Sequence, residues 1–249
     1  MRADPTRQQR LLDLQGVDTR LDQIAHAQSA LPQLKALSAL EAEARSLDTR
    51  LVNAQTALSD VQREVDKAEA DVQLVRDRAA RDQSRLDSGT GSPKDLQALQ
   101  HEVASLARRQ SELEDLELEV MERAEAIAVE VASLEAARAE LAARVEVLTA
   151  DRDAALATLG SEAEEVSGRR GDILSGVGDD LVVLYEKVRS NGGGLGAAEL
   201  RQRRCGGCQL ELNQHEMNRI TAAPADEVLR CEECSRILVR TANSGLFGP

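Results

Sequence analysis

One run of apolar residues constrains the fold of this chain more than any other feature. Its members are spaced alternately three and four residues apart from Leu96 to Leu159. Such a 3.5-residue repeat predicts a helix packed against a partner helix along its whole length, because an isolated stripe of Leu and Val would remain in contact with water. Polar residues interrupt the run at Gln110, Glu117, Arg138 and Arg152. We interpret the first three as fixing the register of the pair or as seam residues that reach solvent.

A second repeat of the same kind, from Leu37 to Leu86, supplies the partner helix. The sequence Asp-Ser-Gly-Thr-Gly-Ser follows, and Pro93 then suits the first turn of the next helix. Two such helices joined by a short turn predict an antiparallel hairpin in which facing positions sum to about 182. At 1.5 Å per residue, the arm from Leu37 to Leu86 is roughly 75 Å long. A parallel dimer of two chains would satisfy the same repeats, but the turn favours the hairpin.

The composition also favours a rod. Aromatic residues make up 1% of the chain and Trp is absent, so large rings cannot dominate a globular core. The net charge of -13 predicts repulsion from nucleic acids and anionic membranes. No apolar run approaches the roughly 18 residues of a membrane span, and the N-terminus has no hydrophobic signal core. We therefore expect a cytoplasmic protein with no membrane partner.

The segments that flank the repeats predict two shorter helices. Asp4-Pro5 is typical of a helix start, and Pro32 predicts a break near residues 29–33. Glycines from Gly160 onward predict the end of the second arm. The apolar cluster between Ile173 and Val188 predicts another helix, which could pack against the N-terminal one at the open base of the hairpin.

All four cysteines lie near the C-terminus, in two Cys-x-x-Cys pairs separated by 22 residues. Two thiolates on a tight turn bind one side of a tetrahedral Zn²⁺, and a second such turn closes the shell. With the short alternating segments around them, the pairs predict a zinc ribbon with one structural zinc per chain, held by Cys205, Cys208, Cys231 and Cys234. A redox dithiol and an iron site are the alternatives, and His215 is a candidate substitute ligand.

The predicted fold class is mainly α, a long antiparallel coiled-coil hairpin plus a small C-terminal β zinc ribbon. The expected domains are an N-terminal helix at the base (1–33), the hairpin (34–160) with its turn at 87–93, a base helix and linker (161–196), and the four-cysteine ribbon (197–249).

Two surfaces are candidates for contacts with a partner. From residue 200 onward the chain has seven arginines and six acidic residues, a net charge of +1. Four thiolates around Zn²⁺ add a charge of -2, which nearly cancels any bulk attraction to nucleic acid. The ribbon lacks the aromatic side chains that stack on single-stranded bases. Nucleic-acid binding would need its arginines on one face: Arg201, Arg203, Arg204, Arg219, Arg236 and Arg240. The second surface is the hairpin tip, with Lys94, Gln97 and His101, for which a solvated helix start is the alternative interpretation.

The chain resembles a bacterial family of four-cysteine zinc-ribbon proteins with a long coiled-coil hairpin, catalogued as a domain of unknown function. The match lies in Ser92 to Glu102, Leu113-Glu-Asp115, Met121-Glu122, Leu184-Tyr185-Glu186 and the two cysteine pairs, the second ending in Cys234-Ser-Arg-Ile-Leu238. Ser235 stands where family members often have Gly. The resemblance implies the fold, and it implies links to nucleic acid, an alternative sigma factor or flagellar and type III export components.

The sequence favours a non-enzymatic scaffold or adaptor with a protein partner over a nucleic-acid-binding protein. It shows no carboxylate pair in a defined pocket and no nucleophile with a base. The glycines at 192–196 lack the Lys and Ser/Thr of a phosphate loop. A zinc with four protein ligands has no open position for catalysis. We expect neither catalysis nor a small-molecule substrate.

Overall fold

The protein is described by a computed structural model that covers residues 1–246. Its helices are α1 (Pro5–Ser29), α2 (Pro32–Asp87), α3 (Pro93–Val177), α4 (Asp179–Asn191) and α5 (Gln214–Ala222), and its strands are β1 (Ala197–Arg201), β2 (Arg204–Cys205), β3 (Leu229–Arg230) and β4 (Ile237–Val239), followed by a 3₁₀ turn, η1 (Ala242–Ser244). The described residues divide into two compact units, one formed by residues 1–34 and 150–246 and one by residues 35–149. No helix in the described part of the chain is long and apolar enough to cross a membrane.

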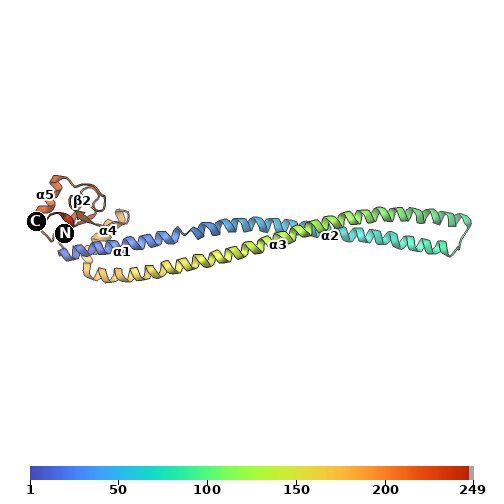
Figure 1. The fold of residues 1–249 in the computed structure, drawn as a ribbon, viewed down its shortest axis with the longest axis horizontal. Coiled ribbons are helices and arrows are strands. Elements are labelled where there is room, and N and C mark those ends of the chain that lie inside the picture. The colour runs from blue at the N-terminus through green and yellow to red at the C-terminus, as the bar shows by residue number, and fades with distance from the viewer. Residues whose placement is uncertain (247–249) are drawn as a thin grey trace. The chain divides into compact units, whose positions relative to one another are not determined.

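Residues 35–149 form the antiparallel hairpin, in which α2 and α3 lie side by side (Figure 1). The apolar repeats make the seam, where Ala54, Val131 and Leu134 are buried together. Ion pairs flank the seam, and Arg138 Nε lies 2.6 Å from Asp48 Oδ1. Three further pairs cross between the helices: Glu64 with Arg123, Arg76 with Glu114, and Arg78 with Glu102. The residue numbers of the paired side chains sum to between 180 and 190, close to the expected 182.

The turn at the hairpin tip is built from local hydrogen bonds. Ser92 and Asp95 form a capping box, in which Asp95 N–H donates to Ser92 Oγ at 3.3 Å and Ser92 N–H donates to Asp95 Oδ2 at 3.1 Å. The hydrogen bonds from Ser92 lower the pKa of Asp95. Gly89 has φ of +64° and Gly91 of +147°, conformations that side chains disfavour. The turn therefore requires the Gly/Ser composition that the sequence shows.

The expectation that glycines end the second arm near residue 160 is wrong. Helix α3 continues to Val177, and Gly160, Gly168 and Gly171 lie within it. A mid-helix glycine costs about 1 kcal/mol relative to Ala, which packing of a long helix easily outweighs. The chain breaks instead at Gly178, whose φ of +88° is unfavourable for other residues. The predicted single base helix is therefore the end of α3 followed by α4.

In the other unit, the helical base and the ribbon share an apolar cluster, and the ribbon has a second one around the cysteines. Leu11 and Leu14 of α1 pack with Tyr185 of α4 and with Ile237 and Val239 of β4. The sheet order is β2-β1-β4-β3, with β1 and β4 parallel and the other pairs antiparallel. The N-terminus joins the ribbon too, because the backbone N–H of Ala3 donates to Asp226 O at 2.8 Å. The ribbon is thus not an appendage but part of this unit.

Candidate metal centre and contact surfaces

The four cysteine sulfurs meet at one point of the ribbon. All Sγ atoms lie within 4.8 Å of one another, with Cys205 and Cys234 at 3.8 Å and Cys208 and Cys231 at 4.0 Å. Tetrahedral Zn²⁺ with Zn–S bonds of about 2.3 Å places its sulfurs about 3.8 Å apart. The residues therefore fit one structural zinc, as the sequence predicts. His215 lies exposed on α5 and is not part of this cluster.

Two matching turns position the sulfurs. In the first, Gln209 N–H donates to Cys205 O at 2.9 Å; in the second, Ser235 N–H donates to Cys231 O at 2.9 Å. The residue after each pair has positive φ, +63° at Gln209 and +58° at Ser235. The backbone is therefore left-handed at the position where family members often have Gly, and this conformation strains Ser235.

A glycine and a glutamate hold the turns in place. A side chain at Gly206 would come within 2.8 Å of Glu199 O on β1, so only glycine permits this approach. The carboxylate of Glu216 on α5 is buried and accepts from the backbone N–H of Glu232 in the second turn at 3.0 Å. No sequence pattern indicates this role for Glu216, because only the fold brings α5 to that turn.

Burial raises the pKa of the Cys205 and Cys231 thiols. Burial also opposes ionisation of Cys234, but hydrogen bonds from the Arg236 backbone and from neighbouring thiols lower its pKa. Metal binding requires all four as thiolates, so loading releases protons and strengthens as pH rises. With four thiolates the shell is closed, and the zinc stabilises the fold.

A buried polar network was also missed. Asp18 of α1 is 1% exposed and accepts from Tyr185 OH at 2.7 Å and from Arg170 Nε at 2.6 Å. Gln15, one turn earlier, accepts from the backbone N–H of Gly196 at 2.6 Å. Burial raises the pKa of Tyr185, so it stays a hydrogen-bond donor. The network ties α1 to α3, α4 and the start of the ribbon.

The structure separates the predicted arginines. Arg201, Arg203 and Arg219 are exposed and lie beside acidic residues of the ribbon. Arg236 donates to the carbonyls of Gly192 and Leu195, and Arg240 to those of Ala223, Pro224 and Ala225, among others; both are half-buried. These two guanidinium groups hold the backbone together. Arg204 is exposed, with no ion pair among the described residues.

At the hairpin tip, Lys94, Gln97 and His101 are all exposed. They lie three and four residues apart on the first turns of α3 and therefore share one face of that helix.

A closed tetrathiolate ribbon combined with an antiparallel helical hairpin defines a zinc-ribbon coiled-coil protein. The sequence model of the CT398-like coiled coil hairpin domain matches residues 14–193, and that of the C4-type zinc ribbon domain matches residues 204–238. The chain belongs to the CT398-like coiled-coil hairpin family. The resemblance seen in the sequence and the predicted fold class are both confirmed.

The chain is similar in sequence and fold to other bacterial proteins, and the similarity covers nearly its whole length. An uncharacterized protein of Mycobacterium tuberculosis is 39% identical over 240 residues, covering 96% of this chain and 98% of that protein. A solved structure from Mycobacterium smegmatis is 38% identical, with a TM-score of 0.85, and covers 96% of this chain and 100% of its own. The structure of CT398 from Chlamydia trachomatis shares the fold at 16% identity, with a TM-score of 0.68 and coverage of 95% and 98%.

Proposed function

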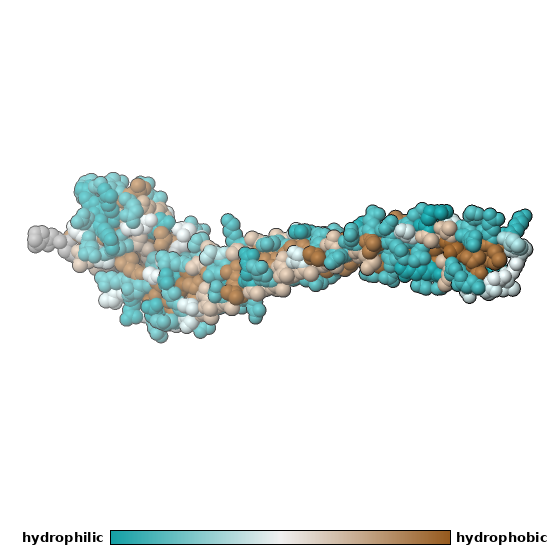
Figure 2. Space-filling view, turned by 45° about the vertical axis from the view of Figure 1, so that its right-hand side comes forward, coloured by the Kyte–Doolittle hydropathy of each residue, from teal (hydrophilic) through white to brown (hydrophobic). Residues whose placement is uncertain are grey.

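We propose that this chain is a non-enzymatic scaffold or adaptor, whose hairpin and ribbon each present a surface to macromolecular partners. The observation that carries the proposal is the excess of exposed apolar side chains on the hairpin. Leu74, Leu118 and Val129 are 65%, 58% and 66% exposed, whereas the seam residues Ala54, Val131 and Leu134 are buried. Figure 2 shows hydrophobic residues interleaved with hydrophilic ones on the visible face of the molecule. Single exposed apolar residues are ordinary, and we infer contacts with other proteins from their recurrence along the hairpin.

The hairpin tip is the first surface we assign to a protein partner. Lys94, Gln97 and His101 offer a cation, an amide and an imidazole on one helix face. The capping box of Ser92 and Asp95 fixes the backbone of the first turn beneath them, so little backbone entropy is lost there when a partner binds.

Nucleic-acid binding through the ribbon has less support. The guanidinium groups of Arg236 and Arg240 already donate to backbone carbonyls, and three of the exposed arginines lie next to carboxylates. The net charge of -13 opposes a polyanion as well. A closed zinc shell likewise favours a structural role over catalysis.

A photo-crosslinking amino acid placed at Gln97 in cells of the source organism tests the proposal. We expect discrete crosslinked proteins that persist through nuclease treatment. The matched control carries the same group at Lys67, exposed in the middle of α2. Crosslinks that disappear with nuclease, or that do not differ between Gln97 and Lys67, would contradict a protein partner at the tip.

A further inference from the structure

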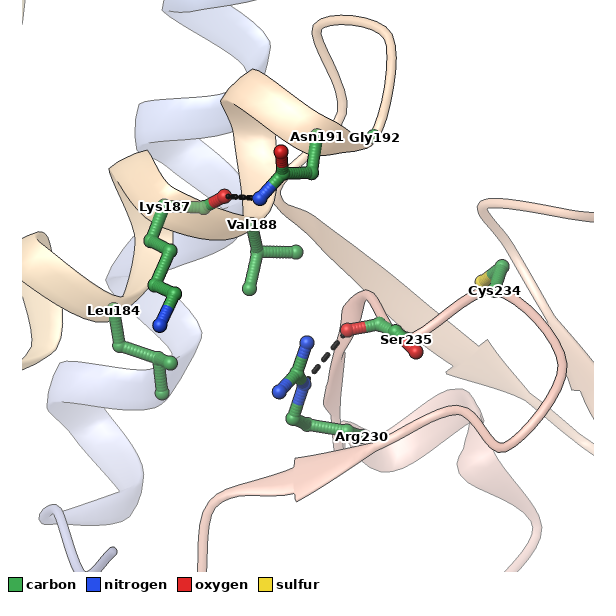
Figure 3. Close-up of a pocket in the computed structure, with 8 residues that line it drawn as sticks. All are labelled: Leu184, Lys187, Val188, Asn191, Gly192, Arg230, Cys234 and Ser235. Carbon is green, nitrogen blue, oxygen red and sulfur yellow. Dashed lines mark hydrogen bonds between the residues drawn. The ribbon is translucent and has the colours of Figure 1, made fainter.

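A small cavity lies between α4 and the second cysteine turn, within the ribbon-containing unit (Figure 3). Leu184, Lys187 and Val188 line it from the helix, and Arg230, Cys234 and Ser235 from the ribbon. Its volume of about 180 Å³ is below the roughly 300 Å³ at which pockets for drug-sized ligands begin. The cavity therefore suits one side chain of a partner rather than a whole metabolite.

Two cations face this cavity without a carboxylate beside them. The side chains of Lys187 and Arg230 point into the gap from opposite walls (Figure 3). Arg230 Nε donates to Ser235 O at 2.7 Å, which fixes the guanidinium and leaves its terminal N–H groups available. Among the described residues, neither side chain lies within ion-pair distance of an acid, whereas Arg189 on the same helix pairs with Asp22 at 2.8 Å.

The local charge balance selects the kind of anion. Four thiolates around Zn²⁺ carry a net charge of -2, and one of them, Cys234, lines the cavity. Lys187 and Arg230 balance that charge. A monoanion then meets little net repulsion, whereas a dianion such as hydrogen phosphate meets more. The apolar wall of Leu184 and Val188 further favours an anion carried on or beside an aliphatic chain.

We propose that this cavity binds the carboxylate of an acidic side chain in a partner protein, with an apolar neighbour of that residue against Leu184 and Val188. The proposal rests on the scaffold function and adds to it a second contact and the chemistry of the segment it takes. Lys187 supplies a point charge, and the terminal N–H groups of Arg230 supply directional hydrogen bonds to the carboxylate.

The test is an NMR titration of the zinc-loaded full chain with the peptide acetyl-Leu-Glu-Leu-amide. We expect saturable shifts at the backbone amides of Gly192 and Ser235 and at Arg230 Nε–H. The neutral peptide acetyl-Leu-Gln-Leu-amide should bind at least about fivefold more weakly. This factor corresponds to the roughly 1 kcal/mol that one exposed ion pair contributes. Acetate should bind more weakly than the acidic peptide, because it makes no apolar contact.

Lys187→Met is the decisive variant. Among the described residues, the side chain of Lys187 makes no hydrogen bond and only its backbone carbonyl accepts from neighbouring side chains, so replacing the side chain should not disturb the fold. It should weaken the acidic peptide about fivefold, while the control Lys67→Met should leave binding unchanged. Equal binding of both peptides, no effect of Lys187→Met, or tighter binding of hydrogen phosphate than of acetate would overturn the proposal. Peptide binding without crosslinked partners at the tip would leave this site standing and count only against the tip as a contact. Crosslinked partners at the tip without peptide binding would overturn this site and leave the tip standing as a contact.

Discussion

The hairpin and the ribbon-containing unit are stabilised in different ways. Residues 35–149 bury a single apolar seam, and most of their polar side chains reach solvent. The other unit buries two apolar clusters, a charged network around Asp18 and a metal site. In a seam, the stabilising free energy is distributed evenly along two helices, so the loss of one contact destabilises only the nearby turns. A core that also depends on a metal and on paired buried charges concentrates its energy in a few groups.

Removing the zinc should produce the largest difference between the two units. Binding of structural zinc is worth about 10 to 16 kcal/mol, which exceeds the stability of most domains. We expect a chelator, or Cys231→Ser, to expose the ribbon and then α1, because Leu11 and Leu14 share its core. Hydrogen exchange should show lost protection in both segments, while residues 35–149 stay protected. Adding zinc back should restore protection in the chelated wild-type chain but not in Cys231→Ser. An equal loss of hydrogen-exchange protection in residues 35–149 would show that the hairpin and the ribbon-containing unit do not differ in their dependence on zinc.

Asp18→Ala should be the next most damaging change. It removes the buried acceptor that Arg170 and Tyr185 share, and breaking a buried ion pair from one side costs about 3 to 5 kcal/mol. Because Arg170 keeps Glu186 and Tyr185 keeps Gln15 as acceptors, we expect a loss at the low end of this range. The matched control is Asp13→Ala, an exposed position on the same helix that should change stability by less than about 0.5 kcal/mol. Chemical denaturation monitored by tyrosine fluorescence measures both, since Tyr185 lies in this core. Similar effects from the two variants would show that the network contributes little.

Leu134→Ala should weaken the hairpin by about 2 kcal/mol, the low end for a buried leucine, because a two-helix seam can partly close over the gap. Leu118→Ala makes the same chemical change on the same helix at an exposed site and should be nearly neutral. Hydrogen exchange should place the loss within about two turns of residue 134 and of Ala54 opposite it. A loss that extended to the ribbon would mean that the two units are coupled.

Ser235→Gly should give the smallest effect, and it should stabilise. Ser235 has φ of +58°, and a side chain in this region costs about 1 kcal/mol or slightly more. Ser161→Gly, in the interior of α3, should instead destabilise by a few tenths of a kcal/mol. Thermal unfolding of the zinc-loaded chain compares them, and a loss of stability in Ser235→Gly would refute the strain argument.

Sequence patterns predicted those parts of the molecule whose causes are local. The 3.5-residue repeats, the Gly/Ser turn before Pro93 and the two cysteine pairs each specify their structure within a few residues. The prediction failed at Gly160, because helix propensity there is outweighed by packing of the end of α3 against α1, where Val177 is buried in one cluster with Leu11 and Leu14. A propensity scale contains no information about such a partner.

The sequence by itself therefore determined the hairpin, the ribbon and its four zinc ligands, since periodicity and ligand spacing are properties of adjacent residues. Only the tertiary structure decided that the ribbon shares a core with α1, that Asp18 is buried beside Arg170, and that Lys187 and Arg230 face one cavity. The members of the last two pairs are separated by 152 and 43 residues. Contacts of that kind arise from how the elements pack, and the identity of either residue alone does not specify them.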